Sequence, residues 1–456
     1  MTARATSAAP PGRFSGGVHP PDHKELSRSA AIEAMPPPAE IALPLLQHTG
    51  APCAPVVEPR AEVAWGARVA DSDAFVSAPI HTPVAGVVQR EGVATLPNAR
   101  HVKTIPIKTG PTQPTAEEIY NDVLGGEWPR DGIGDRAPEE IVKAVRAAGI
   151  VGQGGAAFPT HVKLARNPKK PVDTILVNGC ECEPYLTADY RVMIEAPQPV
   201  IGGARLAAHA AGARAVAIAV EDNKPEAIAA LREAAEGTEA RVIAVPTRYP
   251  MGGEKQTVRV ATGRTIPTGG LPLDVGVVVI NVETAAAIAR AVWRGKPLTH
   301  RVVTVTGGGV VQPKNVLAPI GCRYADLLAF CGGLRPDAAR AVAGGPMMGF
   351  ALGTFDVPVT KGTSGLVILT ADDVRRAAET TCVRCGRCVE ACPLDLMPTR
   401  IALAARHKDW NLAKRHHMLA CMECGCCAYV CPANLPLVQL IRMGKVQMLK
   451  LSLIHI

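Results

Sequence analysis

Two copies of one cysteine pattern constrain this chain more than any other feature. The copies are Cys382-x-x-Cys385-x-x-Cys388-x-x-x-Cys392-Pro393 and Cys421-x-x-Cys424-x-x-Cys427-x-x-x-Cys431-Pro432. This is the spacing of bacterial two-cluster ferredoxins, in which the fourth cysteine of each run binds the other cluster. The predicted ligands are Cys382, Cys385, Cys388 and Cys431 for cluster 1, and Cys421, Cys424, Cys427 and Cys392 for cluster 2. The pattern therefore predicts two 4Fe–4S clusters that serve electron transfer.

The distribution of the cysteines supports a metal site in a reducing compartment. Nine of the 14 cysteines lie between residues 382 and 431, whereas a secreted disulfide protein would spread them more evenly. A zinc ribbon needs two CxxC pairs and would leave half of these cysteines unexplained. Cys426 breaks the pattern and is interpreted as a spare. The remaining cysteines are interpreted as small buried residues, with the best claim to a function at Cys180 and Cys182: Cys53, Cys180, Cys182, Cys322 and Cys331.

Length and charge limit the classes of protein that remain. A chain of 456 residues suggests two to four domains. No apolar run reaches the roughly 18 residues of a membrane span, and no apolar signal region follows the N-terminus. We therefore expect a soluble, cytosolic chain that reaches a membrane only through partners. The net charge of +8 fits either a solvated basic surface or an acidic partner, and no aromatic–basic interleaving suggests nucleic acid.

Changes in pattern along the chain predict a multidomain α/β and α+β fold. Short strands punctuated by Pro and Gly predict a β domain over 41–112. Helical patches that alternate with apolar runs predict an α/β domain over 115–295 with a mainly parallel sheet. The other expected segments are an N-terminal segment at 1–40, a β segment at 298–340, a Gly-rich connector at 341–371 and the cysteine-bearing domain at 372–450. The last six residues, 451–456, are interpreted as a sequencing artefact, after which the natural protein would continue.

A glycine-rich segment and three polar motifs indicate a nucleotide-type site in the α/β domain. Residues 152–163 read GQGGAAFPTHVK, in which three glycines allow a phosphate or flavin to approach the backbone. The segment precedes a predicted strand and does not follow one, so it is not a Rossmann loop, and it lacks GK[ST], so it is not a Walker loop. A glycine-rich turn that binds no ligand stays an alternative. The polar motifs follow at element junctions: Asn178–Tyr185 (NGCECEPY), Gly252–Gln256 (GGEKQ) and Asn281–Thr284 (NVET). Strand ends in open α/β sheets are where ligands bind.

In this order, these motifs resemble the FMN- and NADH-binding block of the flavoprotein subunit of respiratory complex I. With their neighbours they are similar to one family, the C subunit of the Rnf (Rsx) ion-translocating electron transport complex. The further motifs that carry this resemblance are GGVHPPDHK (16–24), GGPMMG (344–349), KGTSGLV (361–367) and the double cysteine run. The resemblance covers roughly residues 14–450. It implies a barrel-sandwich segment, a flavin domain, a β-grasp segment of the SLBB type at 298–340 and a ferredoxin-like domain.

The resemblance also implies the residues that hold the cofactors. Those expected to contact FMN are Gly152, Gly154, Lys163, Asn178, Glu181, Gly253, Glu254, Asn281 and Thr284, and those expected to face the nicotinamide nucleotide are Phe158 and Glu183. No separate catalytic residue is predicted. The barrel-sandwich segment lacks a lysine at the turn in 81–88, so we expect no attached biotin or lipoate. Four positions depart from complex I: Gln153 replaces Arg, Cys180 replaces Asp, Lys255 replaces Glu and Ile280 replaces Asn.

The implied function is electron transfer between NAD(H), FMN and the two clusters, and on to other subunits of a membrane-bound complex that moves Na⁺ or H⁺. Its expected place is the cytoplasmic face of the bacterial inner membrane. Two alternatives stay open. A microcompartment-type cobalamin reductase resembles the flavin and cluster domains, although the preceding β segment and GGVHPPDHK favour the Rnf family. A non-catalytic iron–sulfur relay without flavin is the other. His19 and His23 are interpreted as docking or packing residues, and His416 and His417 as surface residues.

Overall fold

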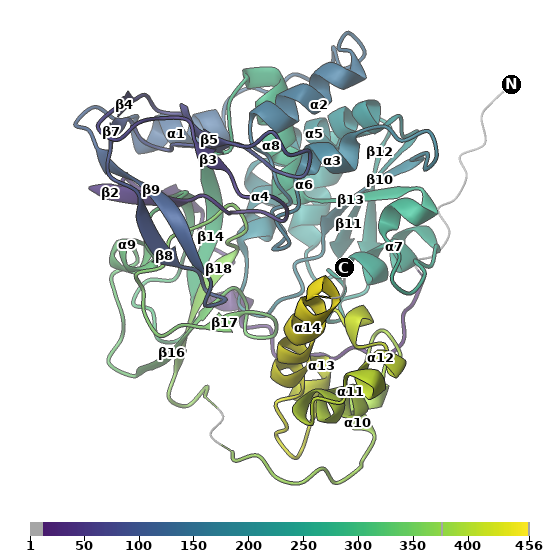
Figure 1. Cartoon of the computed structure of the whole chain (residues 1–456). Coiled ribbons are helices and arrows are strands. Elements are labelled where there is room, and N and C mark those ends of the chain that lie inside the picture. The colour runs from purple at the N-terminus through teal and green to yellow at the C-terminus, as the bar shows by residue number, and fades with distance from the viewer. Residues whose placement is uncertain (1–11, 375–376, 455–456) are drawn as a thin grey trace, which may run out of the picture.

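The computed structural model describes residues 12–374 and 377–454 (Figure 1). Residues 1–11 of the predicted N-terminal segment, and the last two of the predicted artefact, lie outside this part of the chain. Within the described residues, no helix is both long enough and apolar enough to cross a membrane.

The β domain predicted at 41–112 consists of two small sheets. One has the strand order β2-β9-β7-β4, with β8 beside β9, and the other has the order β3-β5-β6. The strands are β2 (Glu40–Pro44), β3 (Ala54–Pro55), β4 (Glu62–Val63), β5 (Arg68–Asp71), β6 (Ile80–His81), β7 (Gly86–Val88), β8 (Gly92–Thr95) and β9 (His101–Thr109). Four of the nine side chains of β9 are buried, among them Ile105 and Ile107 in the core, whereas Lys103 and Lys108 are exposed.

A four-stranded parallel sheet, in the order β12-β11-β10-β13, forms the centre of the α/β domain. The strands are β10 (Thr174–Gly179), β11 (Ala215–Glu221), β12 (Ala240–Val245) and β13 (Val277–Asn281). Their apolar runs are buried on both faces, as in most parallel sheets. Ile175 and Ile218 join the core beneath α5 and α8, whereas Leu176 and Val279 pack with residues of α7 on the opposite face.

The helices of this domain are α1 (Ala116–Val123), α2 (Pro138–Ala147), α3 (Thr160–Leu164), α4 (Ala188–Glu195), α5 (Pro197–Ala211), α6 (Pro225–Ala235), α7 (Glu254–Thr262) and α8 (Val282–Arg294), with the 3-10 helix η2 (Pro272–Val275). Helices α5 and α8 cross at very short range because α5 carries Gly202 and Gly203. A Cβ atom on Gly203 would lie 1.7 Å from the carbonyl oxygen of Ala285 in α8.

A six-stranded sheet, in the order β1-β15-β14-β18-β16-β17, follows the α/β domain. Its elements are β1 (Ile32–Ala34), β14 (His300–Thr306), β15 (Lys314–Pro319), α9 (Tyr324–Phe330), β16 (Ala338–Ala343), β17 (Phe350–Ala351) and β18 (Gly365–Thr370). The interpretation of 341–371 as a connector was wrong, because β18 lies inside this sheet between β14 and β16. The predicted N-terminal segment also contributes its edge strand, β1, which pairs with β15.

The cysteine-bearing domain is a small group of helices that packs beside the α/β domain (yellow in Figure 1). Its elements are α10 (Arg387–Glu390), α11 (Pro398–Arg406), α12 (Trp410–Arg415), η3 (Met418–Ala420), α13 (Cys426–Tyr429) and α14 (Leu437–Ile454). Ile401 and Ile441 are fully buried in its core, together with Ala413 and Met418. Thiols from both cysteine runs belong to the same core.

Candidate functional site

The parallel sheet has its switch point between β10 and β13. The chain runs outward from β10 through β11 to β12 and then returns to place β13 on the other side of β10. Asn178 and Asn281 are register partners at the carboxyl ends of these two neighbouring strands. Crevices at such points are the usual ligand sites of open α/β sheets. The structure therefore brings two of the predicted motifs, NGCECEPY and NVET, to one edge.

The glycine-rich loop contacts the same edge. The backbone N–H of Gly152 donates to the carbonyl of Phe158 at 2.8 Å and closes the loop. The N–H of Gln153 donates to Oγ1 of Thr284 at 2.9 Å, which attaches the loop to α8. A Cβ atom on Gly154 would lie 3.5 Å from the side chain of Asn281, whereas Gly155 has a φ of +103° and open space in front of it. Gly154 and Gly155 thus form an exposed rim beside the strand ends.

Lys163 and Glu254 form another part of this rim. The ammonium group of Lys163 donates to Oε1 of Glu254 at 2.9 Å and to the carbonyl of Val279 in β13 at 3.0 Å. Gly253 precedes α7 as its N-cap residue, and Glu254 is the first residue of that helix. The side chain of Asn178 donates to the carbonyl of Gly252 at 2.8 Å, so the GGEKQ motif is tied to β10.

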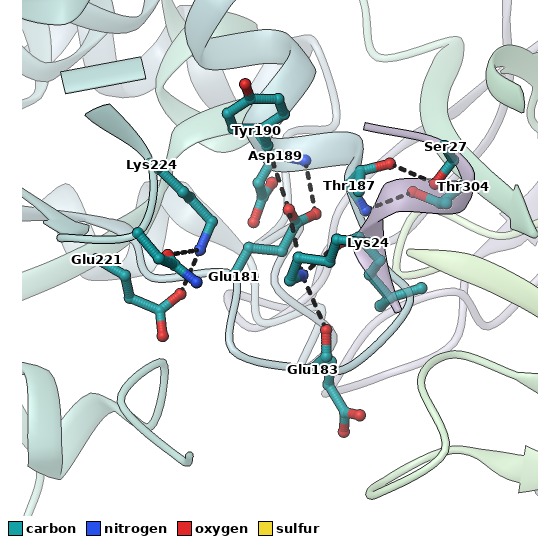
Figure 2. A network of polar contacts seen from close by, with 12 residues as sticks. Lys24, Ser27, Glu181, Glu183, Thr187, Asp189, Tyr190, Glu221, Lys224 and Thr304 are labelled. Atoms are coloured by element: carbon teal, nitrogen blue, oxygen red, sulfur yellow. Dashed lines mark hydrogen bonds and ion pairs between the residues drawn. The ribbon is translucent and has the colours of Figure 1, made fainter. Parts of the chain in front are cut away.

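The two glutamates of NGCECEPY face in different directions (Figure 2). Glu181 is buried and accepts the backbone N–H of Asp189 at 2.9 Å, while Lys24 lies 3.8 Å from its other oxygen. Glu183 accepts the backbone N–H groups of Met347 and Met348 at 3.2 Å and 2.9 Å. Burial raises the pKa of Glu183 to about 7, although these two N–H groups oppose the rise.

Charged groups are concentrated behind the strand ends. Burial and the neighbouring carboxylates of Glu181 and Glu283 raise the pKa of Asp189 well above its usual value. Nδ2 of Asn281 donates to Oδ2 of Asp189 at 2.7 Å. Burial also raises the pKa of Glu283 to about 7, although Arg301 at 3.5 Å opposes the rise. The site therefore holds two carboxyl groups, Glu183 and Glu283, whose pKa lies near neutral pH.

The eleven residues predicted for FMN and the nucleotide divide into two groups. Five lie behind the rim and have polar side chains that form hydrogen bonds within the protein: Asn178, Glu181, Glu183, Asn281 and Thr284. The others form or adjoin the rim: Gly152, Gly154, Phe158, Lys163, Gly253 and Glu254. A lysine and an exposed glycine backbone beside the strand ends fit a phosphate-bearing flavin.

The two cysteine runs adopt the same backbone geometry. Arg384 and Gly386 have left-handed φ angles of 56° and 81°, and their counterparts Glu423 and Gly425 have φ angles of 61° and 85°. Each glycine is the N-cap of a one-turn helix that carries the third cysteine of its run. Left-handed residues turn the chain sharply, so each run forms a tight bend that carries its first three cysteines.

Each predicted ligand set lines a single cavity. Cys392, Cys421, Cys424 and Cys427 line one small cavity, together with apolar residues such as Ile401 and Ile441. A second, more open cavity is lined by Cys382, Cys385, Cys388 and Cys431. In the described part of the chain no three His, Cys, Asp or Glu side chains meet tightly enough to hold one metal ion. In a four-iron cluster each thiolate binds a different iron, so the ligands surround a cavity and do not converge on one point. The thiol sets fit the predicted clusters.

Several contacts at the site were missed from the sequence. Lys24 and Arg301 reach the site from distant segments, and a single charged residue carries no periodic signal. Gly345 contacts Glu183 so closely that a Cβ atom would lie 2.2 Å from Oε2. The GGPMMG motif that contains Gly345 was noted, but its role required the fold. His23 stacks on Tyr185 with ring centroids 4.7 Å apart, in accord with its interpretation as a packing residue.

Family models match four consecutive parts of the chain. Residues 12–111 match the RnfC barrel sandwich hybrid domain, and residues 145–290 match the Nuo51 FMN-binding domain. Residues 302–351 match the SLBB domain, and residues 381–435 match the 4Fe–4S dicluster domain. The chain is thus a multidomain α/β protein with a flavin domain and a two-cluster domain, as predicted.

Similar proteins match almost the whole chain. The C subunit of the proton-translocating ferredoxin:NAD(+) oxidoreductase complex of Clostridium ljungdahlii is 44% identical over 406 residues, which are 89% of this chain and 87% of that protein. The C subunit of the ion-translocating oxidoreductase complex of Rhodobacter capsulatus is 43% identical, over 94% of this chain and 82% of its own. The C subunit of the Na(+)-translocating ferredoxin:NAD(+) oxidoreductase complex of Acetobacterium woodii is 39% identical, over 90% of both chains. On this likeness, which spans every domain described above, the chain belongs to the family of C subunits of Rnf-type ion-translocating oxidoreductase complexes.

Proposed function

We propose that this chain is the NAD(H)-interacting electron-transfer subunit of an ion-translocating ferredoxin:NAD⁺ oxidoreductase, bound peripherally at the cytoplasmic face of the inner membrane. The observation that carries the proposal is the packing of a flavin-type switch point directly against a two-cluster domain. Bound FMN supplies the conversion between two-electron hydride transfer and one-electron transfer, which a nicotinamide and an iron–sulfur cluster cannot exchange directly. The other subunits of the complex would receive or supply the electrons.

The residues of the chain have distinct roles in this proposal. The exposed backbone at Gly154, with Gly152 behind it and Lys163 beside it, would hold the flavin phosphate. Asn178 and Asn281, with Thr284 beneath the loop, would keep the strand ends and the loop in place. Gly253 and Glu254 would close the opposite side. Phe158 and Glu183 would face the nicotinamide nucleotide, and Glu181 would orient the loop between them.

The cluster ligands are proposed as predicted, and their positions suggest an order. Oη of Tyr249 donates to the carbonyl of Cys424 at 2.6 Å, and Nε2 of Gln256 donates to the carbonyl of Pro393 at 3.2 Å. Both donors belong to the flavin domain, so cluster 2 would lie on the side of the cysteine-bearing domain that faces the flavin domain. Cys385 of cluster 1 is exposed, and Val383 beside it is 66% exposed. Electrons would therefore pass between the flavin and cluster 2, and between cluster 1 and a partner subunit.

The test uses the full chain, purified without oxygen, with its clusters reconstituted and FMN added. The visible spectrum is recorded before and after NADH. The proposal expects both flavin and cluster absorption to bleach. If the clusters form but neither FMN nor NADH binds, the chain is a relay without flavin chemistry. Reduction of cob(II)alamin by the same preparation at a comparable rate would favour the cobalamin reductase alternative.

A matched pair of lysine variants tests the flavin site itself. Lys163 and Lys170 each form an ion pair with a carboxylate, at 2.9 Å to Glu254 and 2.5 Å to Asp274. Only Lys163 lies at the switch point. Lys163→Met should weaken FMN binding by about 1.5–3 kcal/mol, or roughly 10- to 100-fold in Kd, since a charged hydrogen bond is lost. Lys170→Met should leave the Kd unchanged. Equal affinities of the two variants would remove Lys163 from the proposed site.

A further inference from the structure

An N-terminal strap, residues 14–24, connects the cluster domain to the flavin domain. It contains the GGVHPPDHK motif, whose role the electron path above does not explain. The strap begins at Phe14, which is buried in the flavin domain with residues of α7, and ends at Lys24, beneath the NGCECEPY loop. Between them it passes behind the yellow helices (purple in Figure 1). Its contacts alternate between the two domains.

The cluster end of the strap depends on two glycines. The N–H of Gly17 donates to the carbonyl of Ala391 at 2.9 Å, next to the cluster 2 ligand Cys392. A Cβ atom on Gly16 would lie 2.5 Å from the carbonyl oxygen of Cys392. A Cβ atom on Gly17 would lie 2.6 Å from the carbonyl oxygen of Tyr249 in the flavin domain. The two glycines are therefore confined between the two domains, with one facing each.

The middle of the strap pairs with the flavin domain. Val18 and Tyr249 exchange two backbone hydrogen bonds, of 2.9 Å and 3.0 Å, in an isolated antiparallel bridge. The hydroxyl of Tyr249 reaches the carbonyl of Cys424, so this residue contacts both the strap and the second cysteine run. Val18 and Tyr249 pack in one apolar cluster with Ala391 and Cys424.

The flavin end of the strap is Lys24, whose side chain ends beneath the NGCECEPY loop (Figure 2). Lys24 is 8% exposed, and its ammonium group donates to the carbonyls of Glu183 at 3.0 Å and of Leu186. It also lies 3.8 Å from the carboxylate of Glu181. The carbonyl of Asp22 accepts the N–H of Tyr185 at 2.6 Å. These contacts attach this end of the strap to the loop proposed to orient the flavin and the nucleotide.

We propose that the strap sets the separation between cluster 2 and the flavin, with Gly16 and Gly17 as its cluster anchor and Lys24 as its flavin anchor. This inference rests on the proposed function. The strap residues are positioning residues, because they contact the loops and not the reacting atoms. Burying a lysine costs free energy, and this cost is offset only when its donors are satisfied. Lys24 meets that condition through both carbonyls, which makes it a rigid attachment point.

The kinetic test displaces the cluster anchor alone. Gly16→Ala is mixed rapidly with NADH without oxygen, and the flavin and cluster absorptions are followed separately. Flavin reduction should keep the wild-type rate, whereas cluster reduction should become slower than in the control, because electron transfer slows as two cofactors move apart. Gly237→Ala is the control, since Gly237 has a comparable φ of +75° and no atom within 4 Å of its Cβ position. Cluster reduction in Gly16→Ala as fast as in Gly237→Ala would overturn the proposal.

A second test needs no electron transfer, so it separates failure of the strap from failure of the proposed function. Amide hydrogen exchange is measured over residues 180–186 and 391–395 without NADH. Lys24→Met should accelerate exchange at Tyr185 by at least about tenfold, because a charge-assisted attachment is lost. Lys24→Arg, which keeps the charge and the donors, should restore most of the protection. Unchanged hydrogen exchange in both Lys24→Met and Gly16→Ala would overturn the proposed role of the strap. A wild-type flavin that NADH does not reduce would instead overturn the proposed function.

Discussion

Arg301 provides the sharpest test of how the sheets support the flavin loop. It extends from β14 of the six-stranded sheet, is 1% exposed, and its guanidinium group contacts three other residues. Its guanidinium donates to Oε1 and to the carbonyl of Gln153 at 2.7 Å and 3.0 Å, and to the carbonyl of Thr363 at 3.0 Å. It also lies 3.5 Å from the carboxylate of Glu283. The side chain of Arg301 therefore joins the six-stranded sheet, the glycine-rich loop and α8.

Replacing Arg301 by Met keeps most of the volume but removes these donors, and the loss should depend on pH. Below about pH 7, Glu283 is largely protonated in the folded protein, so the variant loses mainly the hydrogen bonds to Gln153 and Thr363, worth about 2 kcal/mol. Above about pH 7, the wild-type carboxylate is ionised beside Arg301, whereas the variant must bury it unpaired or keep its proton. Breaking a buried pair costs about 3–5 kcal/mol. Because the variant can keep the proton on Glu283, the extra loss is limited to about 1.4 kcal/mol per pH unit above 7, so the deficit should be about 2 kcal/mol near pH 6 and about 3 kcal/mol near pH 8.

Urea unfolding of the full chain, followed by tryptophan fluorescence at both pH values, measures this deficit. The sign follows from proton linkage: the pKa of Glu283 is raised in the folded state, so stability falls as pH rises towards it. Loss of Arg301 raises that pKa further and extends the fall to higher pH. Arg335→Met is the control, because Arg335 and Asp337 form a pair that is 56% and 54% exposed. It should cost less than about 1 kcal/mol. Equal deficits of Arg301→Met at the two pH values would refute the reasoning.

Three further predictions concern other parts of the chain. Gly345→Ala should displace the Glu183 carboxylate and raise the KM for NADH in steady-state assays while leaving the iron content unchanged; a wild-type KM would contradict the role of Glu183. Cys392→Ala should lower the iron content from about eight to about four atoms per chain, whereas Cys426→Ala should retain about eight; equal losses in chemical iron assays would contradict the ligand assignment. Burial lowers the pKa of Lys361 from 10.5 to about 7, so the folded state binds fewer protons than the unfolded state between these values. The stability of the wild type relative to Lys361→Met should therefore rise from about pH 7 to about pH 9 in urea titrations, and a constant difference would contradict it.

Local patterns predicted the elements whose cause is local. The apolar runs that predicted the α/β domain over 115–295 include residues 174–177 and 215–220, which lie inside β10 and β11, because a strand buried on both faces needs a continuous apolar sequence. The cysteine spacing predicted two thiol sets that the structure does gather around two cavities. In both cases the residues that determine the geometry are close together in the sequence.

Elements that depend on distant partners could not be predicted in the same way. The run GLVILT, which forms β18, lies in a glycine-rich stretch that was interpreted as a connector. Its central position between β14 and β16 depends on pairing across the chain, which no local pattern encodes. The same limit applies to Lys24, whose partners at Glu183 and Leu186 lie about 160 positions away. A buried lysine and an exposed lysine look alike in a sequence.

These long-range contacts explain why glycine pairs and single buried cations recur where the domains meet. A close approach of two backbones requires a residue without Cβ, as at Gly16 and Gly17, and Gly345 likewise leaves room for the side chain of Glu183. A lone cation with several donors can then bind several carbonyl groups at once: Lys24 binds those of Glu183 and Leu186, and Arg301 binds those of Gln153 and Thr363. Such contacts are costly to leave unsatisfied, so they favour one arrangement of the domains over nearby alternatives. For a chain proposed to transfer electrons between cofactors in different domains, a single fixed arrangement is what the rate requires.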